Sequence, residues 1–228
     1  MIGAQLPLAV QLRDAASFET YFAGPNADAV AMLRDTPGSA LLFGPPGSGR
    51  THLLQAVCRA RSGRYWPLAT VSELGPGVLL GHQESLLCLD DVDVVGADRE
   101  WALALLRLLD ACRAEGRAVL LSATAPAERM QLALPDLRTR LTALPAFGLR
   151  TLGDADLLQL LQQRATAKGL ELPDDVARWL LNTQARGTGP LLEALEHLDR
   201  AALSAKRRLT LPFVQSVLAP AGAHKAPG

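Results

Sequence analysis

The stretch GPPGSGRT, residues 44–51, decides how the rest of the sequence is interpreted. It follows the apolar run SALLF (39–43), which predicts a buried strand, and it opens THLLQAVCRARSG (51–63), which predicts a helix. In this context, backbone amides and the helix N-terminus bind phosphate. The predicted nucleotide-binding residues are Gly44, Pro45, Pro46, Gly47, Ser48, Gly49, Arg50, Thr51 and His52.

Arg50 stands where this pattern usually has lysine. Lysine places a compact charge between the phosphates, whereas arginine is longer, planar and forked, so the exchange is not conservative. We expect the loop to bind ADP or ATP, with ADP favoured, and to support weak hydrolysis. A glycine-rich turn without a ligand is the alternative interpretation.

A second motif, LLCLDD (86–91), is an apolar strand that ends in two acids. Asp90 is predicted to hold Mg²⁺ through water, and the hydroxyl of Thr51 is predicted to be a direct Mg²⁺ ligand. Asp91 occupies a position where a water-activating carboxylate is often glutamate, and its shorter side chain limits its reach. The alternative is a strand end that carries two solvated acids.

The order of predicted elements indicates an α/β fold. Apolar runs predict strands at 39–43, 64–71, 86–89 and 117–124, alternating with helices, and Pro67 places the second strand at a sheet edge. From about residue 151, helical patterns alone follow. The predicted parts are a flexible arm (1–12), a nucleotide-binding domain with a parallel sheet (13–150), a small helical lid domain (151–218) and a disordered tail (219–228).

Composition excludes several classes of protein. Lys+Arg and Asp+Glu both total 23, which disfavours autonomous DNA binding. Cys58, Cys88 and Cys112 lie in separate apolar runs and are predicted to be buried, without a disulfide or zinc site. Membrane contact is not expected, since no apolar run approaches the roughly 20 residues of a membrane helix. These features predict a cytoplasmic location.

Four segments carry a resemblance to a known family: SFETYFAGPNADAVAML (17–33), GPPGSGRTHLL with LLCLDD, LPDLRTRL (134–141) and LDRAALSAKRRLTLPFVQSVL (198–218). Together they resemble the AAA+ ATPases related to the replication initiator DnaA, and among these the shorter Hda regulators of DnaA. The resemblance covers residues 5–218. It implies an AAA+ nucleotide-binding domain followed by a lid.

The resemblance also implies roles for single residues. Arg140 would be an arginine finger that acts in trans on the nucleotide of a partner; a surface arginine in an interhelical salt bridge is the alternative, and Arg138 is close by. Thr124 stands at a sensor position where the family usually has an acid. The usual lid arginine falls on Gly189, with Arg186 one turn earlier.

The peptide QLPL, formed by Gln5, Leu6, Pro7 and Leu8, resembles the motif that docks proteins on the bacterial DNA polymerase III beta sliding clamp. The resemblance therefore implies an adaptor, as a possible homodimer, that contacts DNA through the clamp. It would stimulate hydrolysis of DnaA-bound ATP and so inhibit re-initiation of chromosome replication. A stand-alone AAA+ ATPase, such as a helicase loader, and a nucleotide-free interaction module are the alternatives.

Overall fold

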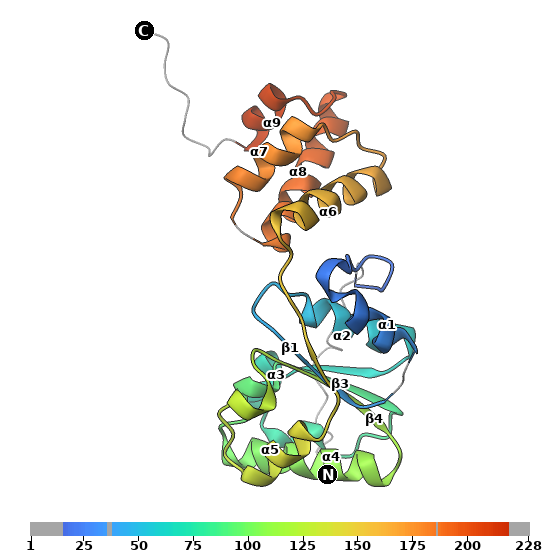
Figure 1. Cartoon of the computed structure of the whole chain (residues 1–228), viewed down its shortest axis with the longest axis vertical. Coiled ribbons are helices and arrows are strands. Elements are labelled where there is room, and N and C mark those ends of the chain that lie inside the picture. Colours follow the sequence, from blue (N-terminus) through green and yellow to red (C-terminus); the bar gives the residue numbers. More distant parts are fainter. Residues whose placement is uncertain (1–15, 36–37, 186, 219–228) are drawn as a thin grey trace. The chain divides into compact units, whose positions relative to one another are not determined.

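The computed structural model describes residues 16–35, 38–185 and 187–218. The chain divides into two compact units, Met1–Thr151 and Leu152–Gly228, and each is described here by itself (Figure 1). The clamp-like peptide Gln5–Leu8, Arg186 and the tail 219–228 lie outside the described residues.

The first unit is built on a five-stranded sheet with the order β2-β3-β4-β1-β5. All its neighbouring strands pair in parallel. The strands are β1 (Ala40–Phe43), β2 (Arg64–Pro67), β3 (Leu86–Asp90), β4 (Ala118–Ala123) and β5 (Ala146–Gly148). Because the strands are parallel, the loops that follow β1, β3 and β4 meet at one edge of the sheet, where ligands bind in open α/β folds.

Helices cover both faces of this sheet, which confirms the predicted α/β fold class. They are α1 (Ala27–Asp35), α2 (Arg50–Ala60), α3 (Leu68–Val71), α4 (Arg99–Ala114) and α5 (Pro135–Thr142). Figure 1 shows α1 and α2 on one side of the sheet and α4 and α5 on the other. Successive strand residues point to opposite faces, so Leu41 joins the core under α4 and α5, while Leu42 joins the core under α1 and α2.

The structure corrects the second predicted strand, which was expected to extend to residue 71. Strand β2 ends at Pro67, paired with Asp90, the last residue of β3. Beyond Pro67 no residue of β3 remains to pair with, and the chain forms the short helix α3. Leu68 and Val71, three positions apart, lie on one face of this helix and pack into the core. The edge position predicted from Pro67 is confirmed.

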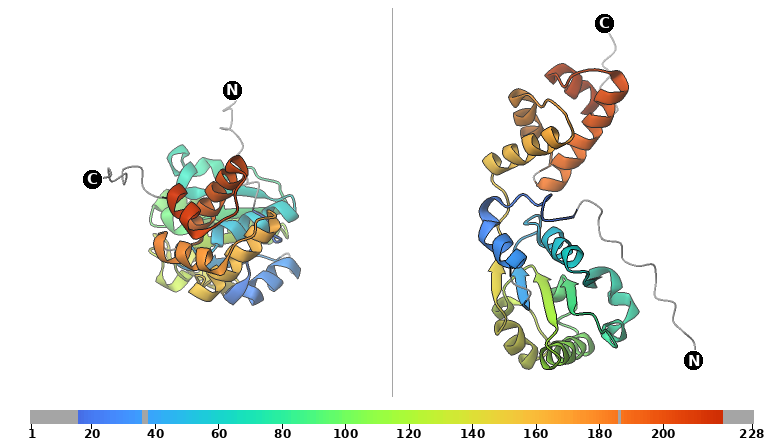
Figure 2. Two further views of the ribbon diagram at one scale, coloured as in Figure 1. Left: turned by 90° about the horizontal axis from the view of Figure 1, so that it is seen from above. Right: turned by 90° about the vertical axis from the view of Figure 1, so that its right-hand side faces the viewer.

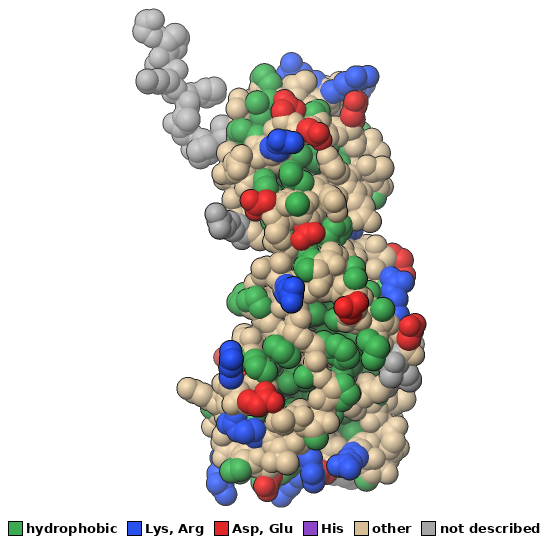
Figure 3. Space-filling model, viewed as in Figure 1, with side chains coloured by type: hydrophobic (Ala, Val, Ile, Leu, Met, Phe, Trp, Pro, Cys, Tyr) green, Lys and Arg blue, Asp and Glu red, His purple; other side chains and the backbone are tan. Residues whose placement is uncertain are grey.

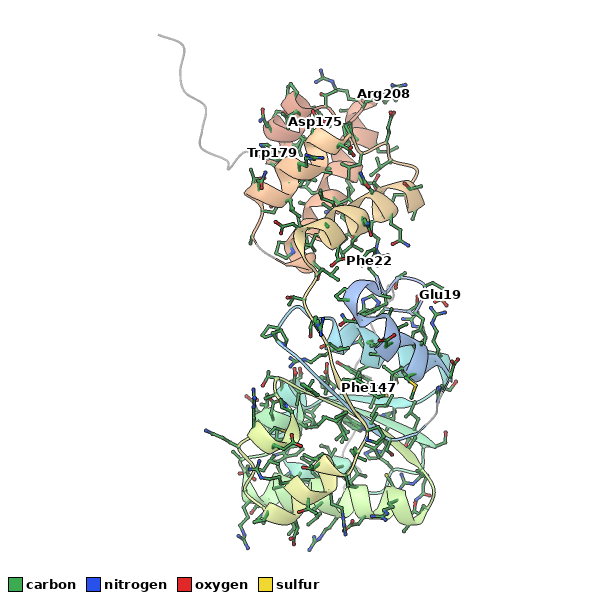
Figure 4. The ribbon with its side chains drawn as sticks, viewed as in Figure 1. Glu19, Phe22, Phe147, Asp175, Trp179 and Arg208 are labelled. Atoms are coloured by element: carbon green, nitrogen blue, oxygen red, sulfur yellow. The ribbon has the colours of Figure 1, made fainter. Side chains whose placement is uncertain are left out.

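Strand β5 was missed by the sequence analysis. It has only three residues, Ala146–Gly148, and two of them are exposed, so it lacks the apolar run that marked the other strands. It forms because it pairs with β1, and Phe147, labelled in Figure 4, pairs with Leu42. Pairing with a strand about a hundred positions earlier leaves no local periodic signal.

In its described residues the second unit contains helices joined by loops and no strand, as predicted. It contains α6 (Asp154–Ala167), α7 (Asp174–Thr183), α8 (Thr188–Ala205) and α9 (Leu211–Leu218). The positions expected to share one face of α8 are all buried in its core: Leu191, Leu195, Leu198 and Ala202. Figure 2 shows these helices packed around one another, and Figure 4 labels Asp175 and Trp179 on α7.

The prediction that the three cysteines are buried also holds in the described part of the chain. Cys58, Cys88 and Cys112 are buried and free. None of the helices within residues 16–35, 38–185 and 187–218 combines the length and apolar character that a membrane crossing requires.

Candidate functional site

The loop between β1 and α2 has the shape of a phosphate cradle. Gly47 and Gly49 have φ values of +81° and +90°, a region that favours glycine. Helix α2 begins after Gly49, which offers no side-chain cap. Its first amides therefore remain available to an external acceptor. The Oγ of Ser48 is buried and has no hydrogen-bond partner among the described residues. These features fit a bound phosphate group, with the half-buried Thr51 in the first turn of α2.

Tyr21 lies against this loop and was not singled out from the sequence. Its Oη donates to the carbonyl of Ser48 at 3.3 Å and accepts from Nδ2 of Asn26 at 3.2 Å. A Cβ at Gly49 would lie 2.7 Å from Cε2 of Tyr21, so glycine is required there by contact as well as by φ. The segment before α1, marked by Glu19 and Phe22 in Figure 4, is thus fixed to the phosphate loop through this tyrosine.

Arg50 does not extend into the cradle. Its Nη1 donates to the carbonyls of Gly44 at 2.6 Å and Ala123 at 2.5 Å, and its Nη2 donates to Oδ1 of Asp91 at 3.2 Å. Only 10% of its side chain is exposed. One guanidinium therefore joins the ends of β1, β4 and β3, and in this conformation it is engaged by protein acceptors.

Asp90, the predicted Mg²⁺ residue, is 3% exposed and holds neighbouring strands together. Its Oδ2 accepts from the Oη of Tyr65 at 2.7 Å, and its Oδ1 accepts from the Oγ of Ser122. Burial, followed by the charge of Asp90, raises the pKa of Tyr65, so this phenol remains a proton donor. Sequence spacing gave no indication of Tyr65 or Ser122, because they reach Asp90 from β2 and β4.

Asp91 follows β3 with a left-handed backbone, φ 57° and ψ 54°. Its amide donates to the Oγ of Ser122 at 2.9 Å, and its carboxylate accepts from Arg50. Burial and the negative charge of Asp90 raise the pKa of Asp91, while Arg50 acts in the opposite direction. The carboxylate predicted to activate water is thus held by the arginine of the phosphate loop.

Thr124, at the predicted sensor position, is held in a similar way. Its amide donates to Oδ2 of Asp93 at 3.0 Å, and its hydroxyl donates to the same oxygen. The other oxygen, Oδ1, is buried without a hydrogen-bond partner in the described part of the chain. Asp93 was overlooked in the sequence, although it is the third acid of LDDVDVV.

The two arginines of α5 have different environments. Arg138 donates to the carbonyls of Ala127, Glu128 and Met130 at 2.8–2.9 Å, which anchors the start of α5. Arg140 donates through Nε to Oδ1 of Asp110 on α4 at 2.6 Å. The interhelical salt bridge considered as the alternative for Arg140 is therefore present, and 42% of the arginine side chain remains exposed.

The structure thus brings part of the predicted site together. Arg50 and Asp91 meet beside the phosphate loop, with Asp90 adjacent to Asp91. Arg140 lies on the α4–α5 surface, and Gly189 lies in α8 of the second unit.

Comparisons with known proteins concern the fold of the chain and its helical lid. Residues 154–218 match the family model described as Hda, lid domain. Domain III of the Thermotoga maritima replication initiation protein DnaA is similar in structure, with a TM-score of 0.74 and 15% identity over 91% of this chain and 97% of that chain.

Two further structures share the fold. AMPPCP-bound DnaA from Aquifex aeolicus has a TM-score of 0.70 and 15% identity over 85% of this chain and 68% of that one. A RuvB variant from Thermotoga maritima has a TM-score of 0.61 and 15% identity over 83% of this chain and 64% of that one. The chain therefore shares the fold of these proteins, and its residues 154–218 match the Hda lid domain.

Proposed function

We propose that this chain is a DnaA regulator that stimulates hydrolysis of DnaA-bound ATP through Arg140, while Gln5–Leu8 docks it on the sliding clamp. The match of residues 154–218 to the Hda lid domain carries the proposal. The fold that the chain shares with domain III of DnaA supports it by analogy.

The chain's own phosphate loop would hold a nucleotide. Gly47, Gly49 and the uncapped start of α2 supply backbone amides, and the buried Oγ of Ser48 lacks a protein partner among the described residues. The DnaA structure from Aquifex aeolicus contains AMPPCP in a protein of this fold. Bound Mg²⁺ would be held by Thr51 and would neutralise phosphate charge. Asp90 would take part through water only where a lone pair is left beside the hydrogen bonds that it accepts from Tyr65 and Ser122.

Hydrolysis by this chain itself would be slow. Efficient attack on a phosphoryl group needs a residue that orients water. Asp91 accepts a hydrogen bond from Arg50, and the hydroxyl of Thr124 donates to Asp93. Because both groups are engaged within the protein, we infer that the nucleotide is mainly a structural ligand, with ADP as the favoured form.

Arg140 supplies what a regulator in trans needs. It lies on a helix packed against α4, and its side chain is 42% exposed. A guanidinium inserted beside a transferring phosphoryl group raises the rate by about 10³–10⁵ in systems of this kind. The partner's active site would provide the remaining groups.

The decisive experiment measures single-turnover hydrolysis of labelled ATP on DnaA, with clamp loaded on DNA. Arg140→Ala is expected to abolish stimulation, while Arg107→Ala, which changes an exposed arginine of α4, serves as the matched control. Gln5→Ala with Leu6→Ala is expected to abolish stimulation and clamp pulldown together.

Undiminished stimulation by Arg140→Ala would reject the proposed finger. Clamp binding that survives the double substitution would reject the docking step. Robust ATP turnover by the chain alone would favour the stand-alone ATPase, and a purified chain that binds neither ADP nor ATP would favour the nucleotide-free module.

A further inference from the structure

The contact between Arg140 and Asp110 uses one side of the guanidinium. Nε donates to Oδ1 of Asp110 at 2.6 Å. Within residues 16–35, 38–185 and 187–218, neither terminal nitrogen of Arg140 donates a hydrogen bond to a protein acceptor. The side chains of the arginine and the aspartate are 42% and 46% exposed. The pair therefore holds the guanidinium beside Asp110, and no described residue accepts a hydrogen bond from its two terminal nitrogens.

Core packing and hydrogen bonds fix the position of helix α5, which carries Arg140. Leu137 and Leu141, on the same helix, are 0% and 2% exposed and belong to the core that α4 shares. Arg138 anchors the beginning of α5 through its carbonyl contacts. Consequently the position of Arg140 is set by a packed helix, and the remaining freedom lies in its long side chain.

Asp110 restricts that freedom. Arginine presents five donors in a planar fork, and an oxyanion accepts two of them from the terminal nitrogens. Asp110 accepts a hydrogen bond from Nε, the donor that remains when both terminal nitrogens of Arg140 bind an oxyanion. Figure 3 shows Lys and Arg side chains, with Asp and Glu side chains among them, over the part of the first unit formed by α4 and α5.

We propose that Asp110 is a positioning residue for Arg140, and that it presents the two terminal nitrogens to a phosphoryl group of the partner. This inference rests on the proposed function and adds a residue to it. An exposed ion pair changes an equilibrium by at most about fivefold. Asp110→Ala is therefore expected to lower the maximal stimulated rate by about fivefold at most, and to leave the chain folded.

The pair itself is tested without any partner. In a nitrogen-15 NMR spectrum of the full chain, the Nε–H signal of Arg140 is assigned by its loss in Arg140→Ala. Slow exchange of this proton with water is expected in the wild type, and fast exchange in Asp110→Ala. Equal exchange rates in the two proteins would overturn the inference.

The kinetic test uses the same hydrolysis assay over a range of chain concentrations. Asp110→Ala should lower the maximal rate while the half-maximal concentration stays constant, since Asp110 orients the finger and does not bind the partner. Asp110→Glu, which restores an acid, should recover part of the rate. Glu100→Gln, an exposed acid of α4 away from the pair, is the matched control and should match the wild type.

The outcomes separate the two proposals. If Arg140→Ala leaves stimulation intact, the proposed function fails, and this inference fails with it. If Arg140→Ala abolishes stimulation but Asp110→Ala maintains or increases it, the inference alone is overturned, because the aspartate is then irrelevant or masks the finger.

Discussion

Replacement of Arg50 by alanine tests whether its guanidinium holds the site together. The side chain is 10% exposed and donates to the carbonyls of Gly44 and Ala123 and to Asp91. Alanine removes all of these contacts at once, at the point where β1, β4 and β3 end. The first unit should therefore lose stability, whatever the state of the nucleotide.

The expected loss follows from these contacts. Two hydrogen bonds from a charged donor to carbonyls contribute about 1.5–3 kcal/mol each, or about 3–6 kcal/mol together. The pair with Asp91 is partly exposed and adds less than about 1 kcal/mol. Recovered solvation of the guanidinium offsets part of this sum, since burying an ion costs several kcal/mol. We expect a net loss of about 3 kcal/mol for Arg50→Ala, and about half as much for Arg50→Lys, which retains one donor group.

Urea unfolding of the nucleotide-free full chain measures this loss. Trp66 and Trp101 lie in the first unit and Trp179 lies in the second. A Trp179→Phe background makes the fluorescence change report on the first unit, which avoids fitting two units as one transition. Arg107→Ala, an exposed arginine of the same unit, is the control and should stay within about 0.5 kcal/mol of the parent.

A loss below about 1 kcal/mol in Arg50→Ala, with an unchanged urea slope, would refute this reasoning. It would mean that water satisfies the two carbonyls as well as the guanidinium does. Arg50 would then be free to turn toward a bound phosphate, and its engagement with Asp91 would no longer explain slow hydrolysis.

Three further predictions concern the same site. Tyr65→Phe should cost about 1–3 kcal/mol in the urea assay, because the buried carboxylate of Asp90 loses a donor; an unchanged midpoint would contradict that role. Gly49→Ala should lower the thermal midpoint and the ADP affinity, both measured by calorimetry, more than Gly47→Ala does. Both glycines have positive φ, but only at Gly49 would the new Cβ lie 2.7 Å from Cε2 of Tyr21. Equal losses in the two variants would exclude a role for this contact. Because the pKa of Asp91 is raised in the folded state, its ionisation lowers the stability of the wild type as pH rises above about 4. Toward neutral pH, the unfolding free energy of Asp91→Asn should therefore increase relative to that of the wild type. A difference that stays constant with pH would argue against this reasoning.

Much of the architecture was predictable because its signals are local. The apolar runs before Gly44 and Asp90 predicted the strands β1 and β3, and the spacing of Leu191, Leu195 and Leu198 predicted the buried face of α8. The glycines of residues 44–51 predicted the phosphate loop from their positions relative to a strand and a helix. The short β5, which has no such local pattern, was missed.

Apart from β5 and α3, the sequence by itself determined the order of the main strands and helices and the place of the phosphate loop, since hydrophobic periodicity and glycine positions act over a few residues. The tertiary structure decided which way the polar side chains turn. Arg50 meets Ala123, Asp90 meets Ser122, and Arg140 meets Asp110, pairs that lie 73, 32 and 30 positions apart. Sheet pairing and helix packing bring these partners within hydrogen-bond distance, and no spacing along the chain encodes that proximity.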